Sequence, residues 1–145
     1  MLPCFNDVGA NTLAYLTALT HLDLSEQDDD YCRGSNPDFN VSDEGARVQA
    51  SLVRLTFLDL RGFQISDGGV RALCFLTALT HLNLSCVPPL SNEVVGLLCC
   101  LPSLASLDLY GDGIYSDEAW GILRNSSISV GGVHRLPYKN SVYHS

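Results

Sequence analysis

The chain carries LTALTHLDLS at Leu16–Ser25 and LTALTHLNLS at Leu76–Ser85, two copies of one pattern that differ at one residue in ten. Two further stretches, LVRLTFLDLR at Leu52–Arg61 and LPSLASLDLY at Leu101–Tyr110, share the spacing L-x-x-L-x-x-L-x-L. The last three copies begin at 52, 76 and 101, so they recur every 24 or 25 residues. Short leucine-spaced units at this period predict a solenoid, in which each unit packs on its neighbours.

Each unit is predicted to contain one short strand followed by one short helix. Alternation in the x-L-x-L-x piece directs its leucines to a core and their neighbours outward. The strands are expected around the leucine pairs 22/24, 58/60, 82/84 and 107/109, with a weaker fifth at Ile128 and Val130. Serine is a strong helix N-cap, and the expected caps are Ser42, Ser66, Ser91 and Ser116, with Asn6 in the same role. Parallel strands joined by right-handed helical crossovers make this an α/β fold.

The repeats divide the chain into two parts. A solenoid of four to five repeats is expected over residues 1–130, and residues 131–145 are expected to form a C-terminal tail or imperfect cap. The first step between repeats is about a dozen residues too long, because EQDDDYCRGSNPDFN at 26–40 is inserted. Its acids, Gly, Ser and Pro predict a loop outside the stack. Asp28–Asp30 lack the alternating ligand positions of a calcium loop, so a solvated acidic loop is expected.

Composition excludes several classes of function. The chain has 145 residues and a formal net charge of −8, which disfavours binding to nucleic acid or to anionic membranes. The start MLPCFNDVGA has no features of a signal peptide, and no run of 18 apolar residues predicts a membrane span. We therefore expect an intracellular, cytoplasmic protein. Most of the six cysteines are expected to be buried thiols, since aligned Cys74 and Cys99 fall on packed helices too far apart for a disulfide.

The leucine pattern followed by Ile65-Ser-Asp-Gly-Gly-Val resembles the cysteine-containing type of leucine-rich repeat, which is found in the substrate-binding halves of F-box proteins. The resemblance covers about residues 2–130. It implies a short horseshoe with the parallel sheet on its concave face and the helices on its convex face. The family places Cys or Asn three residues after the last strand leucine, whereas this chain has Gln27, Phe63, Val87 and Asp112 there. The side-chain ladder of that family is therefore missing or altered here.

Outward strand positions form the candidate binding surface. Adjacent strands lie about 4.8 Å apart, so Asp23, Asp59, Asn83 and Asp108 are expected to make an acidic stripe that favours a cationic partner. A purely structural reading remains open, since Asp and Asn are common at exposed strand positions of such repeats. The strand that carries Phe57 lies between the strands of His21 and His81. The two histidines are therefore expected about 9–10 Å apart, which is too far for joint zinc ligation. Arg61 and Tyr110 belong to residue types enriched at interface hot spots.

These observations predict a protein–protein interaction module without catalysis, cofactor or metal. The expected partner is a protein with a basic surface, bound at His21, Asp23, Phe57, Asp59, Arg61, His81, Asn83, Asp108 and Tyr110. Two alternatives stay open: the substrate-binding adaptor of an SCF-type ubiquitin ligase, which the resemblance implies, and a structural fragment of a longer repeat array. Self-association is also expected, because Leu13 and Leu16 have no preceding repeat to cover them.

Overall fold

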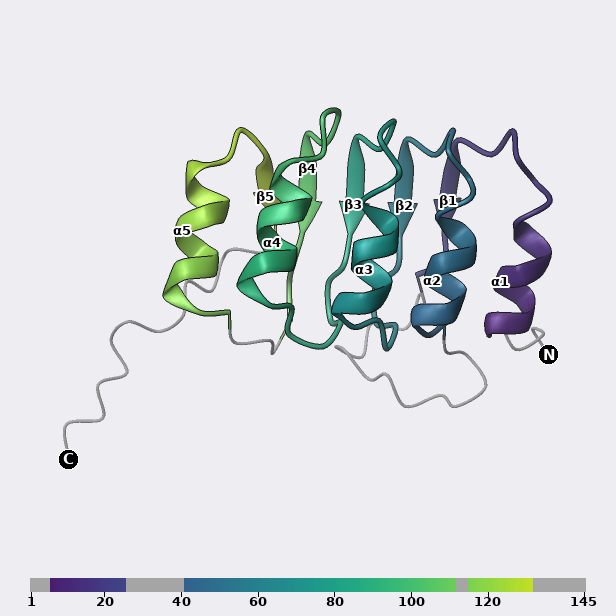
Figure 1. Ribbon diagram of the computed structural model, residues 1–145, viewed down its shortest axis with the longest axis horizontal. Helices are drawn as coiled ribbons and strands as arrows, with labels where there is room; N and C mark the ends of the chain where they lie inside the picture. Colours follow the sequence, from purple (N-terminus) through teal and green to yellow (C-terminus); the bar gives the residue numbers. More distant parts are fainter. Residues whose placement is uncertain (1–5, 26–40, 112–114, 132–145) are drawn as a thin grey trace.

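The computed structural model describes residues 6–25, 41–111 and 115–131. In these residues five helices alternate with five strands, as Figure 1 shows. The helices are α1 (Asp7–Leu13), α2 (Asp43–Gln49), α3 (Asp67–Leu73), α4 (Asn92–Cys99) and α5 (Asp117–Asn125). The strands are β1 (His21–Asp23), β2 (Phe57–Asp59), β3 (His81–Asn83), β4 (Ser106–Asp108) and β5 (Ser129–Gly131). The predicted acidic loop at 26–40, with Gln27 and Asp28–Asp30, lies outside the described residues, as do Asp112 and residues 132–145.

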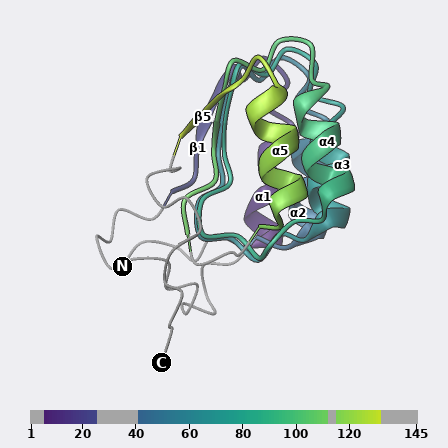
Figure 2. The same ribbon diagram turned by 90° about the vertical axis from the view of Figure 1, so that its left-hand side faces the viewer.

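The five strands form one parallel sheet in the order β1-β2-β3-β4-β5. All the described helices lie on one side of this sheet, and none of them covers the opposite side (Figure 2). The prediction of an α/β chain built as a repeat solenoid is confirmed at this level. The last strand, β5, ends at Gly131, which pairs with Asp108 of β4.

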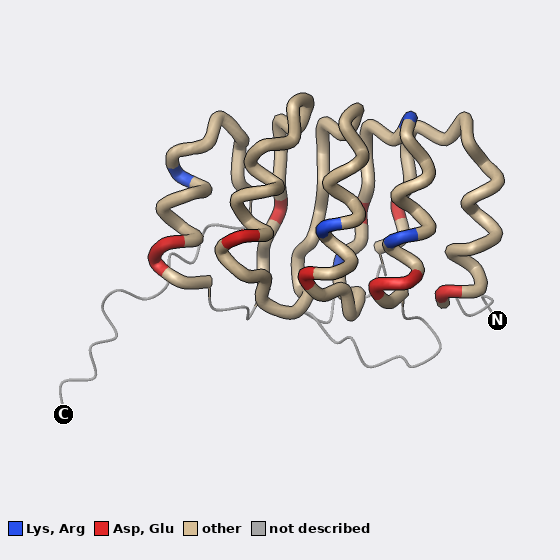
Figure 3. Tube along the Cα trace, in the orientation of Figure 1, with Lys and Arg blue, Asp and Glu red and all other residues tan. Residues whose placement is uncertain are grey.

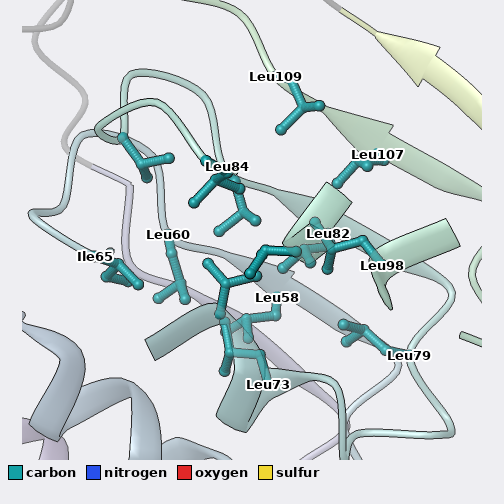
Figure 4. Close-up of a cluster of buried hydrophobic side chains, with 14 of the residues drawn as sticks. Leu58, Leu60, Ile65, Leu73, Leu79, Leu82, Leu84, Leu98, Leu107 and Leu109 are labelled. Carbon is teal, nitrogen blue, oxygen red and sulfur yellow. The ribbon is translucent and has the colours of Figure 1, made fainter. Parts of the chain in front are cut away.

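Burial follows the leucine pattern. Leu22, Leu58, Leu82 and Leu107 face one another in register across the first four strands, and all are buried. Leucines of the helices and turns complete the cluster in Figure 4. In the last repeat Trp120 is buried and meets Tyr115 edge to face, with ring centroids 5.8 Å apart. The same burial raises the pKa of Tyr115 to about 12.

The predicted helix caps are confirmed, and they have a second role. Asn6, Ser42, Ser66, Ser91 and Ser116 each accept a backbone N–H of the helix that they begin. Each serine also donates to the first residue of the preceding helix. These contacts, here called the Asp–Ser contacts, join Ser42 to Asp7, Ser66 to Asp43 and Ser91 to Asp67, and in the last pair Asn92 takes the place of Asp and accepts from Ser116. The hydrogen bonds donated by Ser42 N, Ser42 Oγ, Ser91 N and Ser116 Oγ are 2.6–2.9 Å long. The first turns of the helices are therefore linked from repeat to repeat.

The turn that follows a strand requires a left-handed residue. Gly62 has φ +82° and Gly111 has φ +150°, and Cys86 occupies the equivalent place with φ 61°. A side chain is costly in this region of backbone space, which explains the two glycines. Cys86 is disulfide-bonded, which the sequence analysis did not foresee.

The remaining cysteines of the described part differ from the expectation of buried thiols. Cys74 and Cys99 are half-buried, Cys100 is exposed, and all three are free. Burial raises the pKa of the Cys74 and Cys99 thiols, which keeps both protonated at neutral pH. Phe63 and Val87, two of the positions at which the sequence departs from the pattern that it resembles, are buried apolar side chains.

The two nearly identical repeats show that position in the stack decides burial. Leu76 is 0% exposed between its neighbours, whereas Leu16, at the same place in the first repeat, is 51% exposed. The local sequences are almost the same, so the difference comes from the neighbouring repeat on which Leu76 packs. This matches a solenoid, whose stability is a sum of repeat and nearest-neighbour terms.

We expect Leu76→Ala to lower the free energy of unfolding by about 2–5 kcal/mol, the usual cost of such a change in a core. Leu16→Ala is the matched control and should cost far less, because half of that side chain is already exposed. Urea unfolding followed by circular dichroism measures both. Equal losses at the two positions would contradict the assigned repeat register.

One polar side chain interrupts the core. Gln49 is fully buried in α2, at the position that Leu73 and Leu98 occupy in α3 and α4. Neither its Oε1 nor its Nε2 has a hydrogen-bond partner. An unpaired buried amide is unfavourable, because its bonds to water are lost without replacement.

Gln49→Leu should therefore raise the free energy of unfolding by about 1–3 kcal/mol, since it removes an unsatisfied amide and restores the leucine of the other repeats. The reciprocal change, Leu73→Gln, should destabilise the chain. Thermal and urea unfolding of both variants checks the pair. A destabilised Gln49→Leu variant would mean that the Gln49 amide is not an energetic defect.

Candidate interaction face on the open side of the sheet

The face of the sheet that no helix covers, here called the open sheet face, carries two rows of polar and aromatic side chains. The strand pairing aligns His21, Phe57, His81, Ser106 and Ser129 in a first row. It aligns Asp23, Asp59, Asn83, Asp108 and Gly131 in a second. The sequence analysis expected these rows, and the register brings their members together as neighbours.

Three rings of the first row are neighbours, and two of them are stacked. The rings of His21 and Phe57 are nearly parallel, 8° apart, with centroids at 4.0 Å. Phe57 and His81 are tilted by 32° with centroids at 6.1 Å. Both histidines are exposed and Phe57 is half-buried. Phe57 therefore separates the histidines, and the three rings form one aromatic strip.

The second row has a structural role that sequence reasoning raised only as an alternative. Asp23 Oδ1 accepts from the backbone N–H and the hydroxyl of Ser25. Asp59 Oδ1 accepts the N–H of Arg61, and Asn83 Oδ1 accepts the N–H of Ser85, both over 2.9 Å. Asp and Asn readily bond the backbone two residues on, so this residue type closes the turn after each of the first three strands.

Asp59 is less accessible than expected. It was predicted to be an exposed partner-binding residue, but it is only 9% exposed. Its Oδ2 accepts Nδ2 of Asn83 over 3.0 Å. Burial disfavours the charged form and raises the pKa of Asp59, against the lowering by hydrogen bonds from Arg61 and Asn83. Asp23 lies in the same row with a lowered pKa, chiefly because the Ser25 hydroxyl donates to it.

Asp108 differs from the other carboxylates of its row. The N–H of Tyr110, two residues on, donates to Ser85 Oγ instead, over 3.1 Å. The Asp108 carboxylate lies over Gly131, where an added Cβ would be 1.7 Å from Oδ1. Asp108 as a residue is half-exposed.

A third row begins just beyond the strands. Arg61 and Tyr110 are half-exposed there, whereas Ser85 between them is buried. The predicted anchors therefore border the open sheet face at two separate places.

Acidic residues also gather away from this face. Acidic residues occupy the first turns of the helices, where they suit the positive N-terminal end of the helix dipole. Basic residues lie in the last turns of α2, α3 and α5 (Figure 3). Arg71 Nη1 and Glu93 Oε1 pair over 2.9 Å between α3 and α4, with both side chains largely exposed. In the described part of the chain no group of three or more His, Cys, Asp or Glu could hold a metal ion. None of the described helices is long and apolar enough to cross a bilayer.

Comparison with protein families finds no family whose pattern matches the chain, and no curated protein matches it.

The raised pKa of Asp59 predicts a pH dependence. The folded chain binds this proton more tightly than the unfolded chain does, so the ionised carboxylate costs stability as pH rises above the unfolded value near 3.8. Asp59→Asn should therefore gain stability relative to the parent between about pH 3 and pH 7. Denaturant unfolding over that range measures the difference.

Asp43 provides a control of opposite sign. Its burial is outweighed by hydrogen bonds from Ser66 and Gly69, so its pKa is lowered and its contribution is lost as pH falls. Asp43→Asn should therefore lose stability relative to the parent as pH rises. Parallel pH profiles for the two variants would show that the environments of the two carboxylates do not differ as described.

Proposed function

We propose that this chain is a non-catalytic protein-binding module of the leucine-rich-repeat kind, and that its open sheet face binds a basic protein surface. The observation that carries the proposal is the strip of three aromatic rings beside a row of Asp and Asn side chains, in register on the face that no described helix covers. The buried leucines of L-x-x-L-x-x-L-x-L support the repeat type.

The two rows offer complementary contacts. Rigid aromatic side chains provide contact area at a low cost in conformational entropy, which suits the strip of His21, Phe57 and His81 to apolar parts of a partner. Asp23 and Asp108 attract Lys or Arg, and exposed charges of this kind mainly speed encounter and set specificity. A cation placed beside Asp59 would relieve the cost of burying that carboxylate.

The test begins with affinity capture from the source cell and continues with a titration of the captured partner by calorimetry. Phe57→Ala removes the central ring, and Asp108→Lys reverses one accessible charge of the face. Each should weaken binding about tenfold or more, which corresponds to about 1.4 kcal/mol. Binding to the parent should also weaken as salt rises, because exposed charges are screened.

Glu44→Lys is the matched control, since it changes the net charge as Asp108→Lys does but lies on an exposed position of α2. It should leave affinity nearly unchanged. If Glu44→Lys weakens binding as much as Asp108→Lys, net charge alone explains the effect. If Phe57→Ala and Asp108→Lys both bind like the parent, the open sheet face is not the binding site.

A further inference from the structure

The outer edge of β1 carries backbone groups that no strand of the described chain pairs. β1 is the first strand of the sheet, and its only strand neighbour is β2. Thr20 O accepts the N–H of Phe57, and the N–H of Leu24 donates to Asp59 O, so these groups point towards β2. Because backbone groups alternate along a strand, the N–H and C=O of His21 and Asp23 point to the outer edge.

The same edge exposes apolar side chains. Val8 is 70% exposed, and Leu16 is half-exposed where interior repeats bury their leucine. Val8 is the second residue of α1, and the second residues of other helices show where it points. Glu93 of α4 contacts Arg71 of the preceding helix, and Glu118 of α5 contacts Asn92 of the preceding helix. Val8 therefore faces away from α2, on the edge side of α1.

The β1 edge has few of the charged residues that usually protect an edge strand from pairing with another chain. Natural proteins shield edge strands with charged side chains. Asp23 is the one charged residue of β1, and residues 8–22 contain no Asp, Glu, Lys or Arg. Residues 8–22 therefore add no charge of their own to the repulsion between two copies of a chain with a net charge of −8. The chemistry that covers such an edge in the interior of the sheet is another leucine repeat of this same chain.

We propose that the β1 edge binds a second copy of this chain, with the two β1 strands antiparallel and centred on Leu22. A two-fold axis through that centre places His21 of each copy opposite Asp23 of the other copy. Residues opposite each other in this way exchange both backbone hydrogen bonds, and these are the residues whose N–H and C=O face outward.

Side chains favour the same register. His21 and Asp23 lie on the open sheet face, on either side of Leu22. Asp23 Oδ1 accepts from Ser25, and its Oδ2 can accept an imidazole N–H, which a histidine carries in either protonation state. Two His21–Asp23 pairs across the axis thus give the contact charge complementarity, which a shifted register would lose.

The pairing joins two five-stranded sheets into one of ten strands and makes a single open sheet face from two. The two ring strips then continue across the axis, with the His21 rings at the centre. On the helix side, α1 of each copy brings Val8 towards the other copy. The dimer goes beyond the proposed binding function and does not depend on it, since it rests on the edge alone.

Sedimentation equilibrium of the full chain tests the proposal through its mass. We expect a concentration-dependent species of twice the 15.7 kDa chain mass at micromolar concentrations. Val8→Glu should weaken the dimer at least tenfold, because it places a charge on each side of the contact. This variant should fold, since α2, α4 and α5 carry Glu at the same position. Val53→Glu, on an exposed residue outside the edge, is the control and should remain dimeric.

A charge exchange tests the register. His21→Asp should weaken the dimer by placing two carboxylates opposite each other, and the double variant His21→Asp with Asp23→His should restore it. The proposal is overturned by a monomeric parent at high micromolar concentration, by an open-ended assembly, or by Val8→Glu leaving the dimer intact. Failure of the double variant to recover would overturn the antiparallel register. Partner titration is a separate measurement, so failure of the binding function would leave these masses unchanged.

Discussion

The structure depends on one constraint: the leucines of each repeat are buried by the repeats on either side. Strands of only three residues form few backbone hydrogen bonds, so the sheet is held mainly by the leucine column that runs through its strands. Parallel register follows, because any slip by one residue would turn a leucine outward. Leu16 and Leu76 show the constraint directly, since nearly the same sequence is buried only where two neighbours are present.

Because all the described helices pack on one side of the sheet, side chains on the other side take little part in the core. That side nevertheless has structural roles of its own. The carboxylate row closes turns through Asp23, Asp59 and Asn83, so its composition has a local cause. The stacked rings have no such backbone role in the described residues, and Asp108 does not close its turn. These are the positions on which the proposed binding function depends most directly.

Much of the fold could be predicted because the signals are periodic and local. Leucine spacing gave the strand positions and their register, and Ser42 and its equivalents gave the helix starts. The burial of Asp59, the unpaired Gln49 and the left-handed Cys86 depend on how side chains of neighbouring repeats meet, which spacing alone does not specify. Alignment of Gln49 with Leu73, and of Cys86 with Gly62, contains a signal that could have revealed the last two. For the candidate face, the sequence predicted which residues are neighbours but not which are accessible.

The Asp–Ser contacts at the helix starts have a consequence for how sequence changes are felt along the chain. Asp43 begins α2, yet its carboxylate holds Ser66, the cap of α3. A change at Asp43 would therefore act on the helix one repeat further along, about 24 residues away in sequence. Substitutions at the first residue of one helix and at the cap of the next helix should therefore be correlated. Adjacent repeats would be expected to change together rather than independently.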